Sequence, residues 1–242
     1  MTRNTEELDR ILHEQRDYYD ARATEYDEWW QRQGRYERDG EANERWFAEM
    51  REVQEAVRAA RFVGDVLELA GGTGNWTEVL AQSADRVTVL DAAPEMIRIN
   101  HGRLAAAGLG DRVEYEQVDL FDWRPNRLYD VVFMGFFLSH VPADRLDPFL
   151  AAVAAAVRPG GVVGFVDSKR EPISTSPDQP LSPPEDPIMT RRLNDGRAFQ
   201  VVKIYRSAEE MHAAFARHGV AMEVGETASF FQYGIGRVSP PL

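Results

Sequence analysis

The sequence predicts an α/β fold in which a mainly parallel sheet carries helices on both faces. Between residues 64 and 167, short apolar segments typical of strands alternate with segments of helical periodicity. Strands separated by helices pair in parallel, and right-handed crossovers place the helices on the two faces of the sheet. A glycine-dense turn after the first strand, at 70–74, indicates that the carboxyl edge of the sheet binds a ligand.

Two helices are expected before the sheet, at residues 5–33 and 41–60, with a break at 34–40. Apolar residues of the second helix recur at three- and four-residue spacing from Trp46 to Val57. The sheet itself would use strands at 64–69, 86–91, 112–118, 130–137 and 161–167, with helices near 75–84, 94–107 and 143–157 between them.

The last third of the chain differs in character. Prolines concentrate at 171–187, which is typical of a lid, a binding loop or disorder. Ser207 and Glu210 have the spacing of a capping box, which marks the start of a helix. The segments expected after the proline-rich loop are a charged turn at 191–197, a strand at 199–205, a helix from Ser207 to Gly219 and a final strand at about 220–233.

Composition limits the classes of protein and partner. The 242 residues, 43% of them apolar, suit one domain with a sizeable core or one domain with appendages. A net charge of −12 disfavours nucleic acid and anionic membranes as partners. The chain has no cysteine, which excludes disulfides, thiolate metal sites and cysteine nucleophiles. With no long apolar run and a polar, acidic segment at 1–7 in place of a signal peptide, we expect a cytoplasmic protein.

The segment at 66–77 is the most informative part of the chain. An apolar strand runs into glycines, and a helix starts at once. Glycine has no Cβ, so a ligand can lie against the backbone there, and the helix offers free N–H groups to a polar ligand. A second strand ends at Asp91. This order of strand, glycine turn, helix, strand and acid is that of a nucleoside-binding half-fold, in which the acid takes the ribose hydroxyls.

The turn resembles the first motif of the class I S-adenosylmethionine-dependent methyltransferases. Glu68, Ala70, Gly72 and Gly74 fill that motif, with alanine in place of the commoner first glycine. A dinucleotide motif would need a small residue where Thr77 stands. The later segments that resemble the family are Asp91 after the second strand, Asp119 after the third, the fourth strand at 129–135 and the turn at 158–161.

The resemblance implies a Rossmann-like, seven-stranded, mostly parallel sheet whose last strand is antiparallel, with strands six and seven drawn from 199–233. Residues 1–60 would form an N-terminal helical cap over the cofactor and acceptor. Residues 61–242 would form the core, with a lid-like insertion at 169–198. Within residues 1–60, the segments Tyr18–Ala23 and Glu25–Asp27 resemble the entry segment of small-molecule methyltransferases of the menaquinone-methylating type, in which a tyrosine closes over the cofactor.

S-adenosyl-L-methionine is the cofactor that the resemblance implies, with S-adenosyl-L-homocysteine as its product. Asp91 would bind the ribose, and Asp119 would contact the adenine, with Asp122 as the alternative carboxylate for that contact. Glu68 would hold the methionine amine directly or through the glycine loop. The predicted cofactor-binding residues are Tyr18, Tyr26, Glu68, Ala70, Gly71, Gly72, Gly74, Trp76, Asp91, Ala92, Met96, Asp119, Leu120, Phe121 and Gly135. The predicted catalytic residues are His140 and Tyr26, and the remaining histidines have no metal-site spacing.

Two features remain open to a second interpretation. His140 follows the fourth strand, where ligands sit in such sheets, and a histidine there can accept a proton; it can equally be satisfied within a loop. The charged turn, with Arg191, Arg192, Asp195 and Arg197, could clamp an acidic acceptor or simply face solvent.

We therefore expect methyl transfer by in-line displacement to a small organic acceptor, at oxygen, nitrogen or activated carbon. Four aromatic residues favour an aromatic or apolar acceptor: Trp29, Trp30, Phe136 and Phe137. No nucleic acid or membrane partner is expected, and the protein would be a monomer or a homodimer. The alternatives are an NAD(P)-dependent oxidoreductase and a non-catalytic S-adenosylmethionine sensor, which would need an occluded acceptor pocket.

Overall fold

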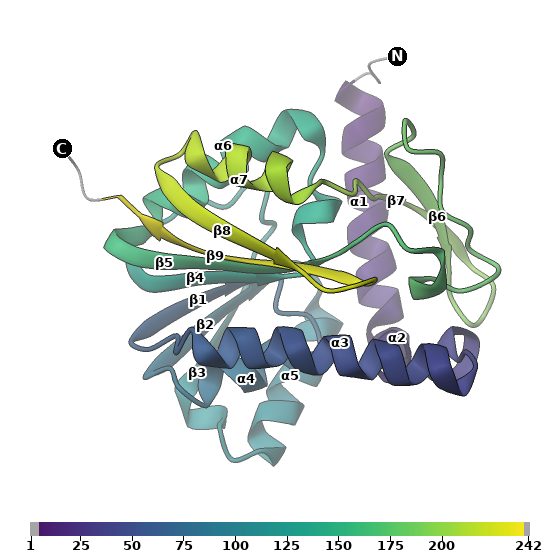
Figure 1. Cartoon of the computed structure of the whole chain (residues 1–242), viewed down its shortest axis with the longest axis horizontal. Coiled ribbons are helices and arrows are strands. Elements are labelled where there is room, and N and C mark those ends of the chain that lie inside the picture. The colour runs from purple at the N-terminus through teal and green to yellow at the C-terminus, as the bar shows by residue number, and fades with distance from the viewer. Residues whose placement is uncertain (1–4, 240–242) are drawn as a thin grey trace.

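A seven-stranded sheet crosses the protein in the strand order β3-β2-β1-β4-β5-β9-β8 (Figure 1). This computed structural model describes residues 5–239, so residues 1–4 and 240–242, the outer ends of the predicted cap and core, lie outside the described part. The strands are β1 (Asp65–Leu69), β2 (Arg86–Asp91), β3 (Val113–Gln117), β4 (Tyr129–Gly135), β5 (Val157–Ser168), β8 (Val220–Glu226) and β9 (Phe231–Val238). Neighbouring strands from β3 to β5 are parallel, whereas β9 is antiparallel to both β5 and β8. The predicted fold class is therefore confirmed.

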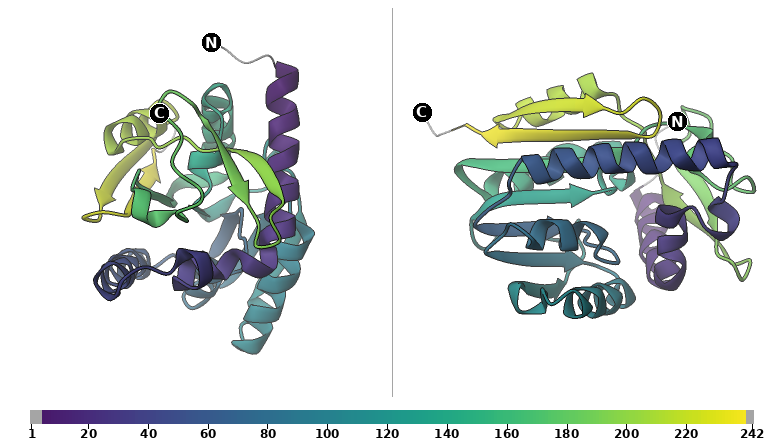
Figure 2. Two further views of the ribbon diagram at one scale, coloured as in Figure 1. Left: turned by 90° about the vertical axis from the view of Figure 1, so that its right-hand side faces the viewer. Right: turned by 60° about the horizontal axis from the view of Figure 1, so that its bottom comes forward.

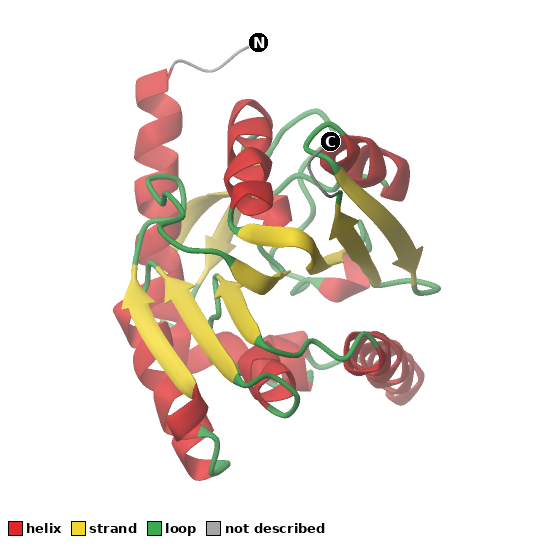
Figure 3. Cartoon of the chain, turned by 90° about the vertical axis from the view of Figure 1, so that its left-hand side faces the viewer, coloured by secondary structure: helices red, strands yellow, loops and turns green. Residues whose placement is uncertain are grey.

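Helices cover both faces of this sheet (Figure 3). One face packs against α3 (Gly40–Ala59), α4 (Asn75–Ala81) and α5 (Pro94–Ala106), and the other against α6 (Ala143–Ala155) and α7 (Ala208–Ala216). Side chains alternate along the strands: Val66 lies with Trp46 of α3 in one core cluster, and Leu67 lies with Phe215 of α7 in the other. Strands buried on both faces explain the continuous apolar runs that predicted a parallel sheet.

The C-terminal strands differ from the prediction in two ways. The strand expected at 199–205 is β7 (Ala198–Val202), which pairs with β6 (Ile188–Arg192) in a separate hairpin and not in the main sheet. The single strand expected at 220–233 is in fact β8 and β9, joined by a turn. Glu49 of α3 is the physical reason, since its buried carboxylate accepts hydrogen bonds from several donors of that turn: Thr227, Ser229 and Phe230.

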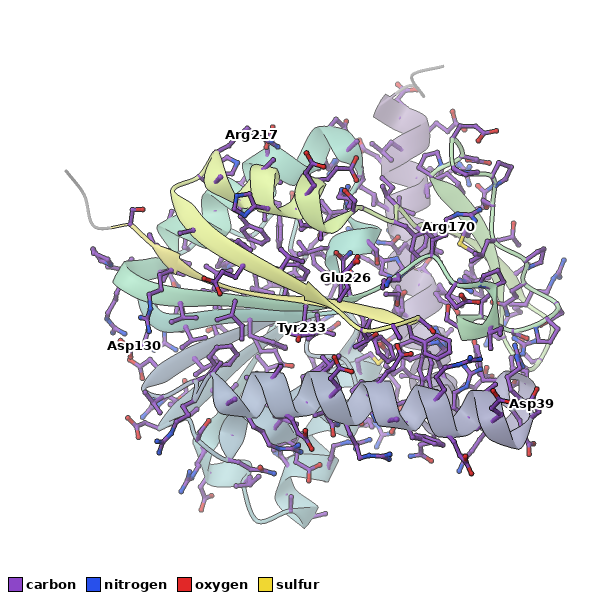
Figure 4. The ribbon with its side chains drawn as sticks, in the orientation of Figure 1. Asp39, Asp130, Arg170, Arg217, Glu226 and Tyr233 are labelled. Carbon is purple, nitrogen blue, oxygen red and sulfur yellow. The ribbon has the colours of Figure 1, made fainter. Side chains whose placement is uncertain are left out.

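The N-terminal helix expected at 5–33 is broken into α1 (Thr5–Arg22), the 3-10 turn η1 (Ala23–Glu25) and α2 (Tyr26–Gln31). Helix α2 is capped at its C-terminus by Arg32, whose φ of 54° is left-handed. The further 3-10 turns are η2 (Gly34–Tyr36), η3 (Gly110–Arg112), η4 (Leu138–His140) and η5 (Pro172–Ser174). Asp39 then caps α3 by accepting a hydrogen bond from the Ala42 N–H at 2.8 Å (Figure 4).

Helix α1 lies beside the β6–β7 hairpin, at the carboxyl edge of the sheet (Figure 2). Asp130, at the start of β4, marks the opposite edge (Figure 4). The carboxamide of Gln15 accepts a hydrogen bond from Val202 of β7 at 2.9 Å, and Asp20 accepts one from Glu95 at the start of α5, also at 2.9 Å. These contacts attach α1 to elements on both sides of the edge.

The described residues contain no helix that is long and apolar enough to cross a membrane.

A buried polar network supports the glycine turn from the side of α4. The Thr77 hydroxyl donates to the Glu68 carboxyl group at 2.6 Å and accepts from the Asn100 amide at 2.8 Å. The Tyr115 hydroxyl donates to the Asn100 carbonyl oxygen at 3.0 Å. Burial raises the pKa of Glu68 from its ordinary 4.5 to about 8, against the opposing bond from Thr77. Glu68 is therefore protonated at neutral pH.

This shift predicts a pH dependence of stability. The unfolded chain releases the Glu68 proton above pH 4.5, whereas the folded protein keeps it until about pH 8. Because the folded state binds more protons in this window, the free energy of unfolding falls as the pH rises through it. Glu68→Gln removes this titration. Between about pH 5 and about pH 8, the free energy of unfolding measured by urea denaturation should therefore fall by up to about 3 kcal/mol more in the wild type than in the variant. Glu52→Gln, on the exposed side of α3, is the control. Equal pH dependence in wild type and Glu68→Gln would contradict the assignment.

Candidate active site

A cavity of about 90 Å³ lies at the carboxyl ends of β1, β2 and β4, under α1. Its position is that of the ligand site in doubly wound sheets. The sequence-predicted residues on its wall are Tyr26, Ala70, Gly72, Asp91, Ala92, Met96, Asp119, Leu120, Phe121, Gly135 and His140. The wall also contains Gln15, Arg16, Tyr19 and Ala93, which are absent from the predicted cofactor-binding and catalytic sets, and Phe136 and Phe137 complete it. We call this cavity the first pocket.

The glycine turn needs its glycines for different reasons. A Cβ at Gly71 would lie 2.3 Å from Val89 Cγ1, and one at Gly74 would lie 2.7 Å from Asn100 Oδ1, so these positions serve close packing. A Cβ at Gly72 would meet nothing within 4 Å, and this residue faces the first pocket with a φ of 54°. Ala70, at a φ of 57°, takes a left-handed conformation that costs a non-glycine residue about 1–2 kcal/mol. Backbone strain of this kind clusters at ligand sites.

Asp91 ties the turn to the end of β2. One carboxylate oxygen accepts from the Gly72 N–H and the other from the Ala93 N–H, each at 2.9 Å. Burial raises the pKa of Asp91, and these backbone hydrogen bonds oppose the rise. A carboxylate has about four acceptor positions, so Asp91 retains capacity for the two hydroxyls of a ribose.

The far end of the first pocket suits a flat aromatic base. Met96, Leu120 and Phe121 supply apolar wall there. Asp119 accepts a hydrogen bond from the Phe121 N–H at 3.0 Å, and its other oxygen forms an ion pair with Arg16 of α1. Asp122, the rival carboxylate, is exposed and lies outside the pocket wall.

Five predicted cofactor residues do not line the first pocket: Tyr18, Glu68, Gly71, Gly74 and Trp76. Glu68 lies beneath the turn, in the network with Thr77. Trp76 packs below Gly135, where a Cβ would come within 2.3 Å of its ring. Tyr18 is fully buried in a cluster with Met189 and Val201 of the hairpin. Its neighbour Tyr19, one residue further round the helix, lines the pocket instead.

Both ring nitrogens of His140 are engaged. Nδ1 lies 2.6 Å from the Val202 carbonyl oxygen, which can only accept, so Nδ1 carries the proton. Nε2 lies 2.7 Å from the Tyr19 hydroxyl and therefore accepts from it. Burial, together with the charge of Lys203, lowers the pKa of His140 well below its ordinary value. His140 is neutral, and a role as base would require the bond to Tyr19 to break.

A second pocket of about 50 Å³ adjoins the first. The two share four wall residues: Tyr19, Tyr26, Phe136 and His140. The other wall residues of the second pocket are Arg22, Trp29, Tyr36, Ser168, Ser174, Thr175, Arg191, Lys203 and Tyr205. Arg22 and Lys203 were not singled out in the sequence, because no local spacing connects them to the cofactor motifs.

The charged turn divides between this pocket and the surface. Arg191 lines the second pocket. Arg192 is exposed, and Asp195 and Arg197 form an exposed ion pair at 2.8 Å. The described residues contain no group of three or more His, Cys, Asp or Glu side chains arranged to hold a metal.

Comparison with known proteins agrees with this geometry. A methyltransferase domain family matches residues 66–161. A ubiquinone biosynthesis O-methyltransferase of Bordetella avium is 35% identical over 113 residues, covering 45% of this chain and 44% of the relative. The ubiquinone/menaquinone biosynthesis C-methyltransferase UbiE of Methylococcus capsulatus is 33% identical over 100 residues, covering 40% of each. The chain thus spans less than half the length of these curated relatives.

Solved structures extend the likeness to nearly the whole chain. DhpI in complex with SAH is 39% identical, with a TM-score of 0.74, over 96% of this chain and 98% of that one. The DhpI-SAM-HEP complex is 39% identical, with a TM-score of 0.75, over 94% and 97% of the two chains. These neighbouring structures contain S-adenosyl-L-methionine or its product, and the residues that line the first pocket here suit the same molecules. The chain belongs to the class I S-adenosylmethionine-dependent methyltransferases, and its cofactor is S-adenosyl-L-methionine.

Proposed function

We propose that the protein transfers a methyl group from S-adenosyl-L-methionine to a small organic acceptor held in the second pocket. One observation carries this proposal: Tyr19, Tyr26, Phe136 and His140 form a wall common to both pockets. A donor in the first pocket and an acceptor in the second would meet at that wall. The small volume of the second pocket, about 50 Å³, favours an acceptor of few atoms.

The residues of the first pocket fit the donor. Asp91 would hold the ribose hydroxyls, and Met96, Leu120 and Phe121 would flank the adenine, with Asp119 near its amino group. Glu68 would act through the glycine turn that it supports. Bound S-adenosyl-L-methionine supplies a methyl group that is already activated, so orientation and exclusion of water are the main requirements on the protein.

Helix α1 and the aromatic wall would meet these requirements. Tyr19 and Tyr26 are both buried enough that their pKa values are raised, so both are neutral phenols. His140 fixes the hydroxyl of Tyr19, so His140 is a positioning residue in this proposal. Tyr26 remains a candidate for direct contact with the reacting groups.

The two alternatives are less well supported. A nicotinamide enzyme needs a small residue at position 77, where Thr77 is fully buried and bonded to Glu68. A non-catalytic sensor needs no acceptor site, whereas a polar pocket adjoins the cofactor pocket here.

The direct experiment is incubation with S-adenosyl-L-methionine and a panel of small acceptors, with S-adenosyl-L-homocysteine and methylated product measured by mass spectrometry. We expect equimolar formation of both with at least one acceptor. Tight cofactor binding with no product from any acceptor would favour the sensor.

Asp91→Asn should weaken cofactor binding. The change keeps the shape of the side chain but removes the charge that two ribose hydroxyls would meet, so the Kd for S-adenosyl-L-homocysteine should rise about 10- to 100-fold in calorimetric titration. Asp122→Asn, at the exposed rival carboxylate, should leave that Kd within about twofold. An unchanged Kd in Asp91→Asn would show that the ribose is bound elsewhere.

We also propose that the insertion at 169–198 contributes to the wall of the acceptor site and not to the wall of the cofactor site. Its residues Ser174, Thr175 and Arg191 line the second pocket, and none of its residues lines the first. It is attached to α2 through the Trp29 Nε1–H, which donates to the Ser174 carbonyl at 2.8 Å.

Thr175→Val tests this division. The Thr175 hydroxyl accepts from Arg191 at 2.6 Å and donates to the Gln179 carbonyl at 3.2 Å, so its loss should displace the wall. We expect the acceptor KM to rise about 10-fold and the cofactor Kd to stay within about twofold. Thr190→Val, exposed on β6, is the matched control. Equal changes in both constants would argue against a separate acceptor wall.

A further inference from the structure

Three cationic side chains line the second pocket: Arg22, Arg191 and Lys203. The wall of this pocket contains no aspartate or glutamate. This concentration of positive charge occurs in a chain whose net charge is −12. The partners of each cation therefore decide whether its charge is compensated within the protein.

Arg22 is buried, with 8% of its surface exposed. Its guanidinium donates to the Tyr36 hydroxyl at 3.1 Å and lies 5.0 Å from the centre of the Tyr26 ring. None of the ion pairs found among residues 5–239 includes Arg22. A buried guanidinium surrounded by phenol rings is expensive to keep unless an anion joins it.

Arg191 is held by neutral groups. Its Nη1 donates to Thr175 Oγ1 at 2.6 Å and to Gln179 Oε1 at 3.3 Å. It too takes part in none of the ion pairs of the described residues. These two hydrogen bonds orient the guanidinium at the pocket wall and leave its charge without a counter-ion.

Lys203 differs from the two arginines because it forms an ion pair within the described part of the chain. Its Nζ donates to Ser139 Oγ at 2.7 Å and lies 3.7 Å from Asp167 Oδ1. Asp167 is already bonded to the N–H groups of Ser139 and Ser168, each at 2.7 Å. Among residues 5–239, Lys203 is thus the one of the three cations with an ion pair, and Arg22 and Arg191 leave two positive charges uncompensated around a buried polar pocket.

We infer that the acceptor is a small oxyanion, a carboxylate or a phosphoryl anion, which Arg22, Arg191 and Lys203 hold for methylation on its charged oxygen. This inference rests on the proposed methyl transfer and names its substrate class. Fixed guanidinium groups suit both kinds of anion because they donate in a planar fork. The Ser168 hydroxyl on the same wall adds a neutral partner. This charged wall argues against the aromatic or apolar acceptor that the sequence suggested.

The chemistry balances without a base. A lone pair of the acceptor oxygen forms the O–CH3 bond while the S–CH3 bond breaks and its electron pair stays on sulfur. The sulfonium becomes a neutral thioether, and the oxyanion loses one negative charge as it becomes an ester. No proton leaves the acceptor, which is consistent with a neutral His140 whose Nε2 is already bonded to Tyr19.

The test measures anion binding to protein saturated with S-adenosyl-L-homocysteine, by calorimetric titration with inorganic phosphate and with acetate at constant ionic strength. We expect at least one of the two to bind at one site. Arg191→Gln should weaken that binding at least 10-fold, and Arg191→Lys should weaken it less. Arg192→Gln is the matched control, because it removes the same charge from the next residue of β6, where the side chain is exposed. Affinity for S-adenosyl-L-homocysteine reports whether each variant is folded.

The outcomes separate the two proposals. Stronger binding of phosphate or of acetate identifies the kind of oxyanion, and either result with Arg191 dependence supports the inference. Binding of neither anion, or equal binding by Arg191→Gln and Arg192→Gln, overturns it. Methyl transfer to neutral acceptors that Arg191→Gln leaves unchanged would also overturn it while the proposed function stands. Arg191-dependent anion binding with no methyl transfer to any acceptor, charged or neutral, would overturn the proposed function instead.

Discussion

The position of α1 across the carboxyl edge of the sheet is the constraint on which the rest of the site depends. Side chains along one side of this helix reach separate elements: Gln15 reaches β7, Arg16 reaches Asp119 and Asp20 reaches the start of α5. Tyr19 adds its bond to His140. An open sheet edge is thereby covered, and the covered space divides into two pockets that meet at Tyr19 and Tyr26.

The two pockets differ in the charge of their walls, and the difference follows from which elements supply them. Strand ends and the glycine turn give the first pocket its carboxylates, Asp91 and Asp119, beside an apolar patch. Helix α1, the hairpin and the segment after it give the second pocket its cations. The wall of the second pocket would therefore suit an acceptor that carries negative charge, whereas the carboxylates of the first pocket would suit the ribose hydroxyls and the adenine amino group of the donor.

The nucleotide-binding half of the fold was predictable because its signals are local. The glycine turn and the acid that ends β2 each depend on residues within a few positions of one another, as does the capping box at Ser207 outside this half. The pairing of β6 with β7 and the division of the last strand by Glu49 were not predictable in this way, because both depend on contacts between distant segments.

The same distinction applies to the site. Tyr19 could not be told from Tyr18 without knowing which side of α1 faces the sheet. Arg22 and Lys203 lie far apart in the chain and share no motif, so only the folded protein shows that they line one pocket.

The most direct test of the central claim, that donor and acceptor meet at the wall shared by the two pockets, is an experimental structure of the complex with S-adenosyl-L-homocysteine. We predict that the sulfur atom faces the opening between the pockets, within about 4 Å of Tyr26 or Phe136, with the ribose on Asp91. A sulfur atom that faces away from the second pocket, or a ribose bound elsewhere, would contradict the account.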